Sequence, residues 1–163
     1  MTTKFENFQK KCIKWILSEE NAHYSTCEVY IQKCREVGFL PLKKRFDFIV
    51  LVLLYKIIYK LIPIQLPLYL EFFDGNSRLR SCHLDNLSLV SDIRPKSNTN
   101  LKYYTLQKSF FYRTHLLWNN IPMELRSINE LQKFKSELLK FMWQLVLDDI
   151  DNLASDDERD GGG

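Results

Sequence analysis

The sequence predicts a mainly α-helical protein: a bundle of about five helices, with room for a short β-hairpin between residues 78 and 108. Apolar residues recur at intervals of three and four in several stretches, as on one face of a helix. Capping residues, glycines and prolines separate these stretches. The chain is 45% hydrophobic and holds only 5 Gly and 5 Pro in 163 residues, which excludes a disordered or fibrous protein.

The first helix is predicted to run from about Lys4 to Leu17 and to be both basic and amphipathic. The apolar residues that share one face are Phe5, Phe8, Cys12 and Trp15, and the lysines on another are Lys4, Lys10, Lys11 and Lys14.

A second helix is predicted to begin near Ser25, whose side chain caps it while Glu28 reaches back, and to end at Gly38. Cys27 and Cys34 lie seven residues apart on one face of this helix. Free cysteine is often buried, so both are expected in the core.

The third helix is expected to start at Pro41 and to continue to Pro63. It is apolar nearly all round, which predicts the most buried helix. Residues 64–73 suggest a turn or short helix, residues 74–77 a loop, and residues 78–108 short apolar alternations typical of strands.

A helix over residues 109–119 should be stopped by Asn119, Asn120 and Pro122. Phe110, Leu117 and Trp118 on this helix are expected in the core. A last helix should follow a capping box formed by Ser127 and Glu130. Its apolar heptad stripe consists of Leu131, Phe134, Leu138, Phe141 and Leu145.

Charge divides the chain unevenly. Residues 1–147 hold 22 Lys and Arg against 13 Asp and Glu, whereas residues 148–163 hold 1 against 7. Residues 1–147 are therefore expected to form a helical domain that favours an anionic partner, and residues 148–163 an acidic disordered tail.

Three segments carry a family resemblance: GFLPLKKRFD at residues 38–47, SFFYRTHLLWNNIPMELRS at 109–127 and LQKFKSELL at 131–139. Their wording and order resemble the carboxy-terminal, thumb and post-palm region of reverse transcriptases from LINE-type (non-LTR) retrotransposons. The resemblance covers about residues 5 to 143. It implies a module that follows the fingers and palm of the same polyprotein and grips the template-primer duplex, RNA-DNA or DNA, during target-primed reverse transcription.

Catalytic residues are not predicted in this chain. Polymerase chemistry needs carboxylates that hold two metal ions, delivered in that superfamily by an aromatic-x-Asp-Asp turn, which the sequence lacks. The Asp148-Asp149 pair follows an apolar run but sits where a helix dissolves into the tail. Cys82 and His83 lack a second ligand pair at zinc spacing. The isolated chain is thus expected to be no enzyme and to need no metal or cofactor.

The candidate functional residues are basic groups near aromatic rings, which suit phosphates and bases respectively. The predicted nucleic-acid contacts are Lys10, Lys11, Lys14, Lys43, Lys44, Arg45, Arg78, Arg80 and Arg113.

Two other functions remain open. The heptad stripe of the last helix could make a protein-interaction surface in a decayed element that binds no nucleic acid. The apolar residues 46–70 could associate with a membrane, although Lys56, Lys60, Pro63 and Pro67 interrupt them and no stable insertion is expected. Four cysteines without paired spacing and no secretory signal favour an intracellular protein, nuclear or cytoplasmic.

Overall fold

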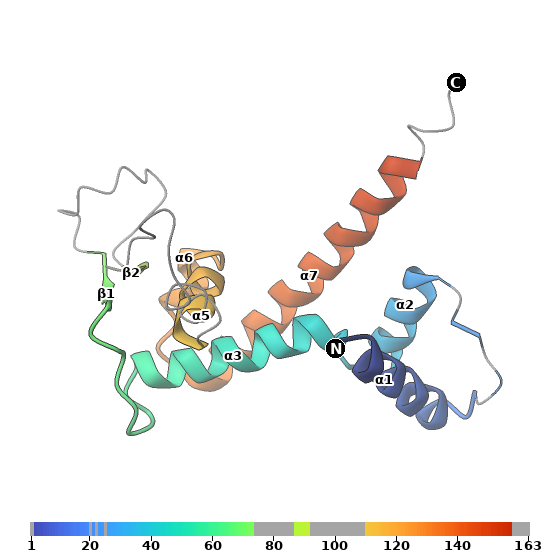
Figure 1. Cartoon of the computed structure of the whole chain (residues 1–163), viewed down its shortest axis with the longest axis horizontal. Helices are drawn as coiled ribbons and strands as arrows, with labels where there is room; N and C mark the ends of the chain where they lie inside the picture. The colour runs from blue at the N-terminus through green and yellow to red at the C-terminus, as the bar shows by residue number, and fades with distance from the viewer. Residues whose placement is uncertain are drawn as a thin grey trace, which may run out of the picture. The chain divides into compact units, whose positions relative to one another are not determined.

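The computed structural model describes residues 2–19, 21, 23–24, 26–73, 87–91 and 110–157 (Figure 1). In chain order its elements are α1 (Thr2–Ile16), α2 (Cys27–Val37), α3 (Leu42–Ile58), β1 (Leu70–Phe72), β2 (Leu89–Ser91), α5 (Phe110–Asn119), α6 (Met123–Arg126) and α7 (Leu131–Asp157). The mainly helical class with one short antiparallel strand pair is confirmed. The four-residue helix α6 was not predicted.

The chain divides into two compact units. The first unit comprises residues 1–48 and 138–163, and the second comprises residues 49–137. Helices α3 and α7 each contribute residues to both units.

The core of the first unit is built by α1, α2, the segment before α2, and α7. Its buried members are Ile13, Tyr24, Tyr30, Ile31, Cys34 and Val146, with Leu17, Val37, Trp143 and Ile150 packed around them. The Gln9 amide, also buried, donates to the Leu40 carbonyl at 2.9 Å and so ties α1 to the chain after α2.

Helix α2 begins one residue later than predicted. Thr26, not Ser25, is the N-cap, and its side chain accepts a hydrogen bond from the Val29 amide. Gly38 ends the helix, as predicted, with a left-handed φ of 75° that glycine adopts without steric cost.

The prediction of two core cysteines in α2 is half wrong. Cys34 is fully buried, and burial raises the pKa of its thiol to about 11. Cys27 is exposed because it occupies the first turn, where the shared helical face extends past the core.

Helix α3 ends at Ile58, well before the predicted Pro63. The backbone is left-handed at Lys60, with φ 55°. The Leu61 N–H donates a hydrogen bond to the Lys56 carbonyl at 2.8 Å. A left-handed residue followed by this hydrogen bond is a common way for a helix to end, and the left-handed position is usually glycine. The fully or nearly buried side chains of α3, more than any other described helix carries, are Leu51, Val52, Leu54, Tyr55 and Ile57.

Burial does not extend all round α3. Phe46 and Ile49 are 51% and 52% exposed, so two of the large apolar side chains of this helix lie outside the described core.

An aromatic stack is part of the core of the second unit. The Tyr55 ring lies 4.3 Å from the Tyr59 ring and 4.1 Å from the Phe134 ring, both in stacked geometry. The two tyrosine hydroxyls donate to the backbone carbonyls of Ile128 and Arg126, each at 2.8 Å. The stack therefore joins α3, α7 and the turn between α6 and α7.

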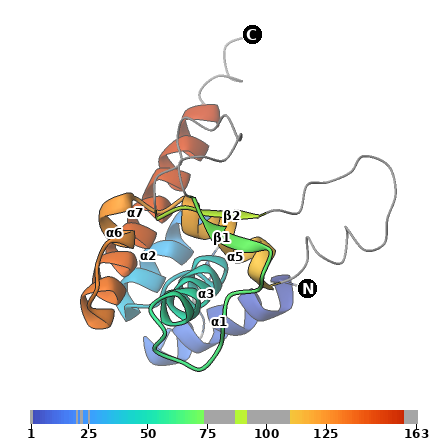
Figure 2. The ribbon, with the colours of Figure 1, turned by 90° about the vertical axis from the view of Figure 1, so that its left-hand side faces the viewer.

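The two strands pair antiparallel, with Leu70 opposite Ser91 and Phe72 opposite Leu89, and lie side by side in Figure 2. β2 falls within the range predicted for a hairpin. β1 does not: it occupies residues 70–72, for which a turn or short helix was predicted. Residues 74–86 and 92–109, which hold the rest of that prediction, lie outside the described residues.

Helix α5 docks against β2 through the end of the SFFYRTHLLWNN motif. The Asn119 amide accepts from the Leu89 N–H at 2.9 Å and donates to the Leu89 carbonyl at 2.8 Å, as a neighbouring strand would. The Trp118 indole donates to the Leu87 carbonyl at 2.9 Å. Asn119 thus fixes a strand besides ending a helix.

The capping box predicted from Ser127 to Glu130 is wrong. The Ser127 hydroxyl donates to the Glu124 carbonyl and closes α6, and α7 begins at Leu131. Arg126, in the same turn, is buried and donates to the Ser88 hydroxyl at 2.9 Å.

Helix α7 continues to Asp157, well past residue 147, where the tail was expected to begin. Residues 158–163 lie outside the described part of the chain. In the heptad stripe, Phe134 and Leu138 are fully buried, while Leu131, Phe141 and Leu145 are half-buried.

His115 on α5 gives a pH-dependent stability. Burial lowers the pKa of its imidazole from the ordinary 6.5, so the folded state binds a proton less readily than the unfolded state. We expect the free energy of unfolding to fall as pH drops below 6.5, until the lowered folded pKa is passed. Urea unfolding of the wild type and of His115→Gln across this range should show the wild type losing stability relative to the variant. A constant difference would contradict the buried, neutral imidazole.

Candidate nucleic-acid interface

Helix α1 presents three different faces, because successive residues rotate by about 100° around a helix. One face is buried through Gln9 and Ile13, which are 6% and 0% exposed. The predicted apolar face is not in the core: Phe5, Phe8 and Trp15 are 59%, 67% and 76% exposed. These three side chains, with Ile16 at the same edge, are called the aromatic face below.

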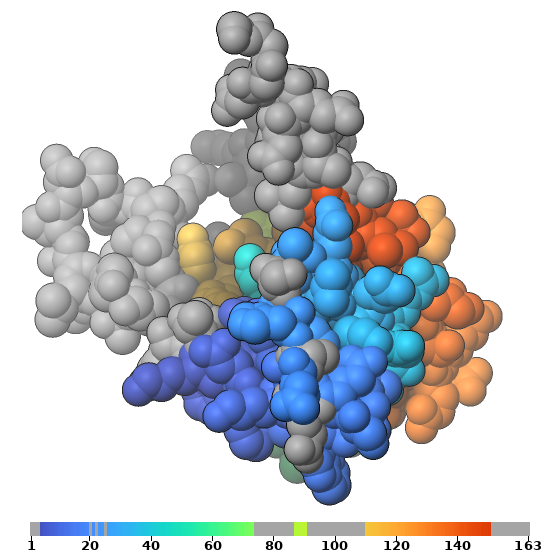
Figure 3. Space-filling model, turned by 90° about the vertical axis from the view of Figure 1, so that its right-hand side faces the viewer, coloured from blue at the N-terminus to red at the C-terminus, as the bar shows by residue number. Residues whose placement is uncertain are grey.

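The third face of α1 is basic and borders the aromatic face. The basic face consists of Lys4, Lys10, Lys11 and Lys14. Lys4 and Lys11 are exposed and lie next to Trp15 and Phe8 by helical spacing. Figure 3 shows the surface that α1 and α2 form side by side.

Two of these lysines are held by rings from the rest of the first unit. The Lys10 ammonium lies 5.0 Å from the centre of the Tyr30 ring, and the Lys14 ammonium 5.2 Å from that of Tyr24. Such cation–π contacts orient an ammonium while leaving its other side open to an anion. Lys10 and Lys14 are half-buried, so α1 presents two cations that contact rings and two that are exposed.

The three consecutive basic residues at the start of α3 do not act together. Lys44 pairs with Asp149 of α7 at 3.0 Å, and the Arg45 guanidinium lies 5.2 Å from the centre of the Phe39 ring. Lys43 is exposed. Consecutive helical residues point in different directions, so the structure divides this predicted cluster between an internal ion pair, a ring contact and solvent.

The other predicted contacts belong to other parts of the chain. Arg113 is exposed on α5, in the second unit. Arg78 and Arg80 lie outside the described residues.

Two acidic side chains of the first unit form ion pairs with one lysine of α2. The Lys33 ammonium binds Glu19 at 2.7 Å and Glu36 at 2.9 Å, and these hydrogen bonds raise its pKa. Tyr24, beside Glu19, also has a raised pKa, first because it is buried and then because of that carboxylate. Glu19 and Glu36 are thus both paired with Lys33.

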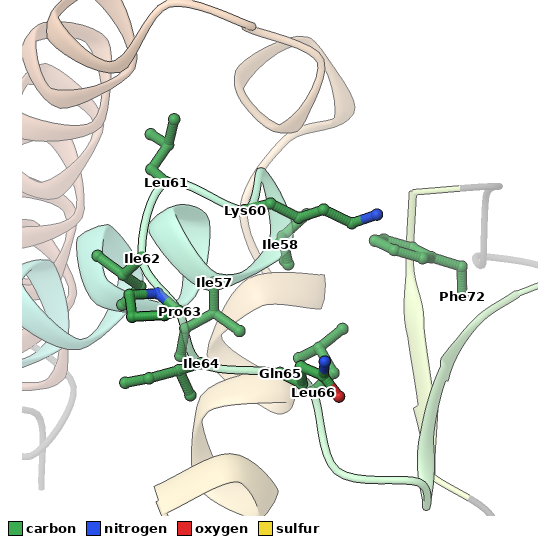
Figure 4. Close-up of a pocket in the computed structure, with 10 residues that line it drawn as sticks. All are labelled: Ile57, Ile58, Lys60, Leu61, Ile62, Pro63, Ile64, Gln65, Leu66 and Phe72. Carbon is green, nitrogen blue, oxygen red and sulfur yellow. The ribbon is translucent and has the colours of Figure 1, made fainter.

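The second unit contains a hollow of about 810 Å³, where the chain leaves α3 and passes toward β1 (Figure 4). It is lined by Ile57, Ile58, Lys60, Leu61, Ile62, Pro63, Ile64, Gln65, Leu66 and Phe72. The Lys60 side chain reaches toward the Phe72 ring in Figure 4. The hollow suits an apolar side chain, and it was missed because residues 64–73 were predicted only as a turn or short helix.

Acidic and metal-ligating groups do not form a site in the described ranges. Within the part of the chain that the structure describes, no group of three or more His, Cys, Asp or Glu side chains could hold a metal ion. Cys82 and His83 are outside these ranges. Asp148 and Asp149 lie within α7, where Asp149 pairs with Lys44.

The apolar run at residues 46–70 does not form one long helix. Of the helices in the described part of the chain, none combines the length and hydropathy that crossing a bilayer requires.

Comparison with known proteins returns no match: no family model covers the chain, and no curated protein or solved structure resembles it significantly.

Proposed function

We propose that this chain is a non-catalytic, carboxy-terminal part of a retrotransposon reverse transcriptase and that it binds template-primer nucleic acid through α1. The family part of the proposal is supported by the ordered motifs at residues 38–47, 109–127 and 131–139. Its partner in the same polyprotein would be the preceding fingers and palm.

One observation carries the binding role: the basic face of α1 lies beside an aromatic face that the described residues of the first unit leave exposed. Lysines bind phosphates without regard to sequence, and exposed rings stack on bases. Burying Phe8 and Trp15 in the core would have been favourable, so their exposure on a helix anchored by Ile13 points to an external partner.

The experiment measures binding of the full chain to a fluorescent RNA-DNA duplex with an unpaired template overhang, by anisotropy at several salt concentrations. We expect weak binding with little sequence preference, and a steep loss of affinity between about 50 and 200 mM salt, because bound lysines release counterions. The double variant K4Q/K11Q should reduce the slope of log K against log salt by roughly one for each phosphate that the missing lysines no longer neutralise.

The matched control is K133Q/K135Q, which removes two lysines from α7. Its charge change equals that of K4Q/K11Q, so it should leave the slope almost unchanged. No binding at low salt, or an equal effect of the two double variants, would contradict a site on α1.

A protein interface is the second candidate, favoured by the spacing of Phe5, Phe8, Cys12 and Trp15, which follows a heptad seam. The heptad stripe on α7, which the sequence also favours for this role, has Phe134 and Leu138 buried. Self-association at high salt without nucleic-acid affinity would favour this candidate.

A further inference from the structure

We infer that the α1 site selects unpaired strands, and that its ligand is the single-stranded template beside the primer duplex and not the duplex itself. This inference rests on the proposed function and names the substrate class of the same site. It starts from the exposure of the three rings, which rises along α1 from 59% at Phe5 to 67% at Phe8 and 76% at Trp15.

Paired bases cannot use these rings. Inside a duplex each base face is covered by its neighbours, and exposing one requires unstacking a step, which is unfavourable. An unpaired base has a free face, and stacking on an aromatic side chain stabilises it whatever the base. The aromatic face can therefore stack only on the bases of a strand that is already unpaired.

The rings on α1 are far enough apart to stack on different bases. Phe8 and Trp15 are seven residues apart, or about 10.5 Å along the axis at 1.5 Å per residue. Stacked bases of one strand are only about 3.4 Å apart, so one base cannot occupy both rings. Lys11 lies between the two rings in sequence, and Lys4 precedes them, so ammonium groups accompany the rings along one side.

The fixed lysines support a continuous track. Tyr30 and Tyr24 hold Lys10 and Lys14 at 5.0 and 5.2 Å, on the side of the basic face nearer the core. Backbone phosphates would meet the basic face while bases turn toward the aromatic face. This combination of a cationic track and stacking rings is the general design of sites for single strands.

The test compares three probes with the same number of phosphates: a single-stranded RNA, the same strand with abasic sites at its centre, and a blunt RNA-DNA duplex. We expect the full chain to bind the intact single strand most tightly, with the abasic strand and the duplex weaker by about fivefold or more. Losing one stack of about 1 to 3 kcal/mol corresponds to a loss of roughly 5- to 150-fold.

The variant F8A/W15A should weaken single-strand binding by roughly 30-fold, two stacks at the lower end of that range, and change duplex binding less than twofold. F8Y/W15F, which keeps both rings, should restore affinity. L68A serves as control, because Leu68 is 97% exposed but lies in the second unit. Far-UV circular dichroism of each variant checks that α1 remains folded.

Equal binding of the intact and abasic strands, or an equal loss of single-strand and duplex binding in F8A/W15A, would overturn the single-strand inference while the proposed function stands. Tighter binding of the blunt duplex would do the same. Failure of all three probes at low salt would instead remove the proposed function.

Discussion

Trp118→Ala should reduce the free energy of unfolding by about 3 to 5 kcal/mol, as expected for truncating a fully buried aromatic side chain. The indole is 1% exposed and lies against the Phe134 ring, with 6.1 Å between the ring centres. The variant also loses the hydrogen bond to the Leu87 carbonyl. Because domains of this size are stable by roughly 5 to 15 kcal/mol, this loss is a large fraction of the total stability. Urea unfolding followed by far-UV circular dichroism measures the loss.

The matched control is Leu116→Ala on the same helix. Leu116 is 49% exposed, so its truncation should cost no more than about 1 kcal/mol. A Trp118→Ala variant with unchanged stability but weakened nucleic-acid binding would show that the indole contacts ligand and not the core.

Phe134→Ala should cost a similar amount, about 3 to 5 kcal/mol, because the ring is fully buried and ends the stack on Tyr55. Phe134→Leu keeps most of the volume and should lose only about 1 to 1.5 kcal/mol. The same denaturant unfolding distinguishes them. If the two substitutions cost the same, the loss would come from the stacked ring and not from the cavity.

The two sites should also interact. Since the Trp118 and Phe134 rings are neighbours, the double variant should be destabilised by less than the sum of the single effects. Additive effects would mean that the two side chains occupy independent parts of the core.

Periodicity located the helices because amphipathic spacing is a local property. The stretches around α1, α2, α5 and α7 were each identified, and Gly38 and Pro122 marked boundaries that the structure keeps. The end of α3 was missed because it depends on a left-handed Lys60, a conformation that a lysine side chain does not announce.

The strand β1 was missed for a different reason. Three residues can pair as a strand only when a partner is present, and here that partner, β2, is fixed by the Asn119 side chain. Asn119 had been assigned to helix termination alone. A strand-like contact made by a side-chain amide has no signature in the sequence.

The candidate site shows the same division. The sequence identified the lysines and rings of α1, but helical spacing gives relative angles only and does not say which face the core takes. Ile13 and Gln9, and not the aromatic residues, enter the core. At Lys44, the prediction of a phosphate contact did not foresee the Asp149 ion pair, which joins residues 105 apart.

By itself, then, the sequence determined the helical class, most helix positions, the basic character of residues 1–147 and the burial of Trp118. These follow from local spacing, capping chemistry and composition. The tertiary structure alone decided which face of α1 remains exposed, which cations are engaged within the chain, and how β2 is held. Those outcomes depend on contacts between residues far apart in the sequence, and the energies of such contacts cannot be read from a local pattern.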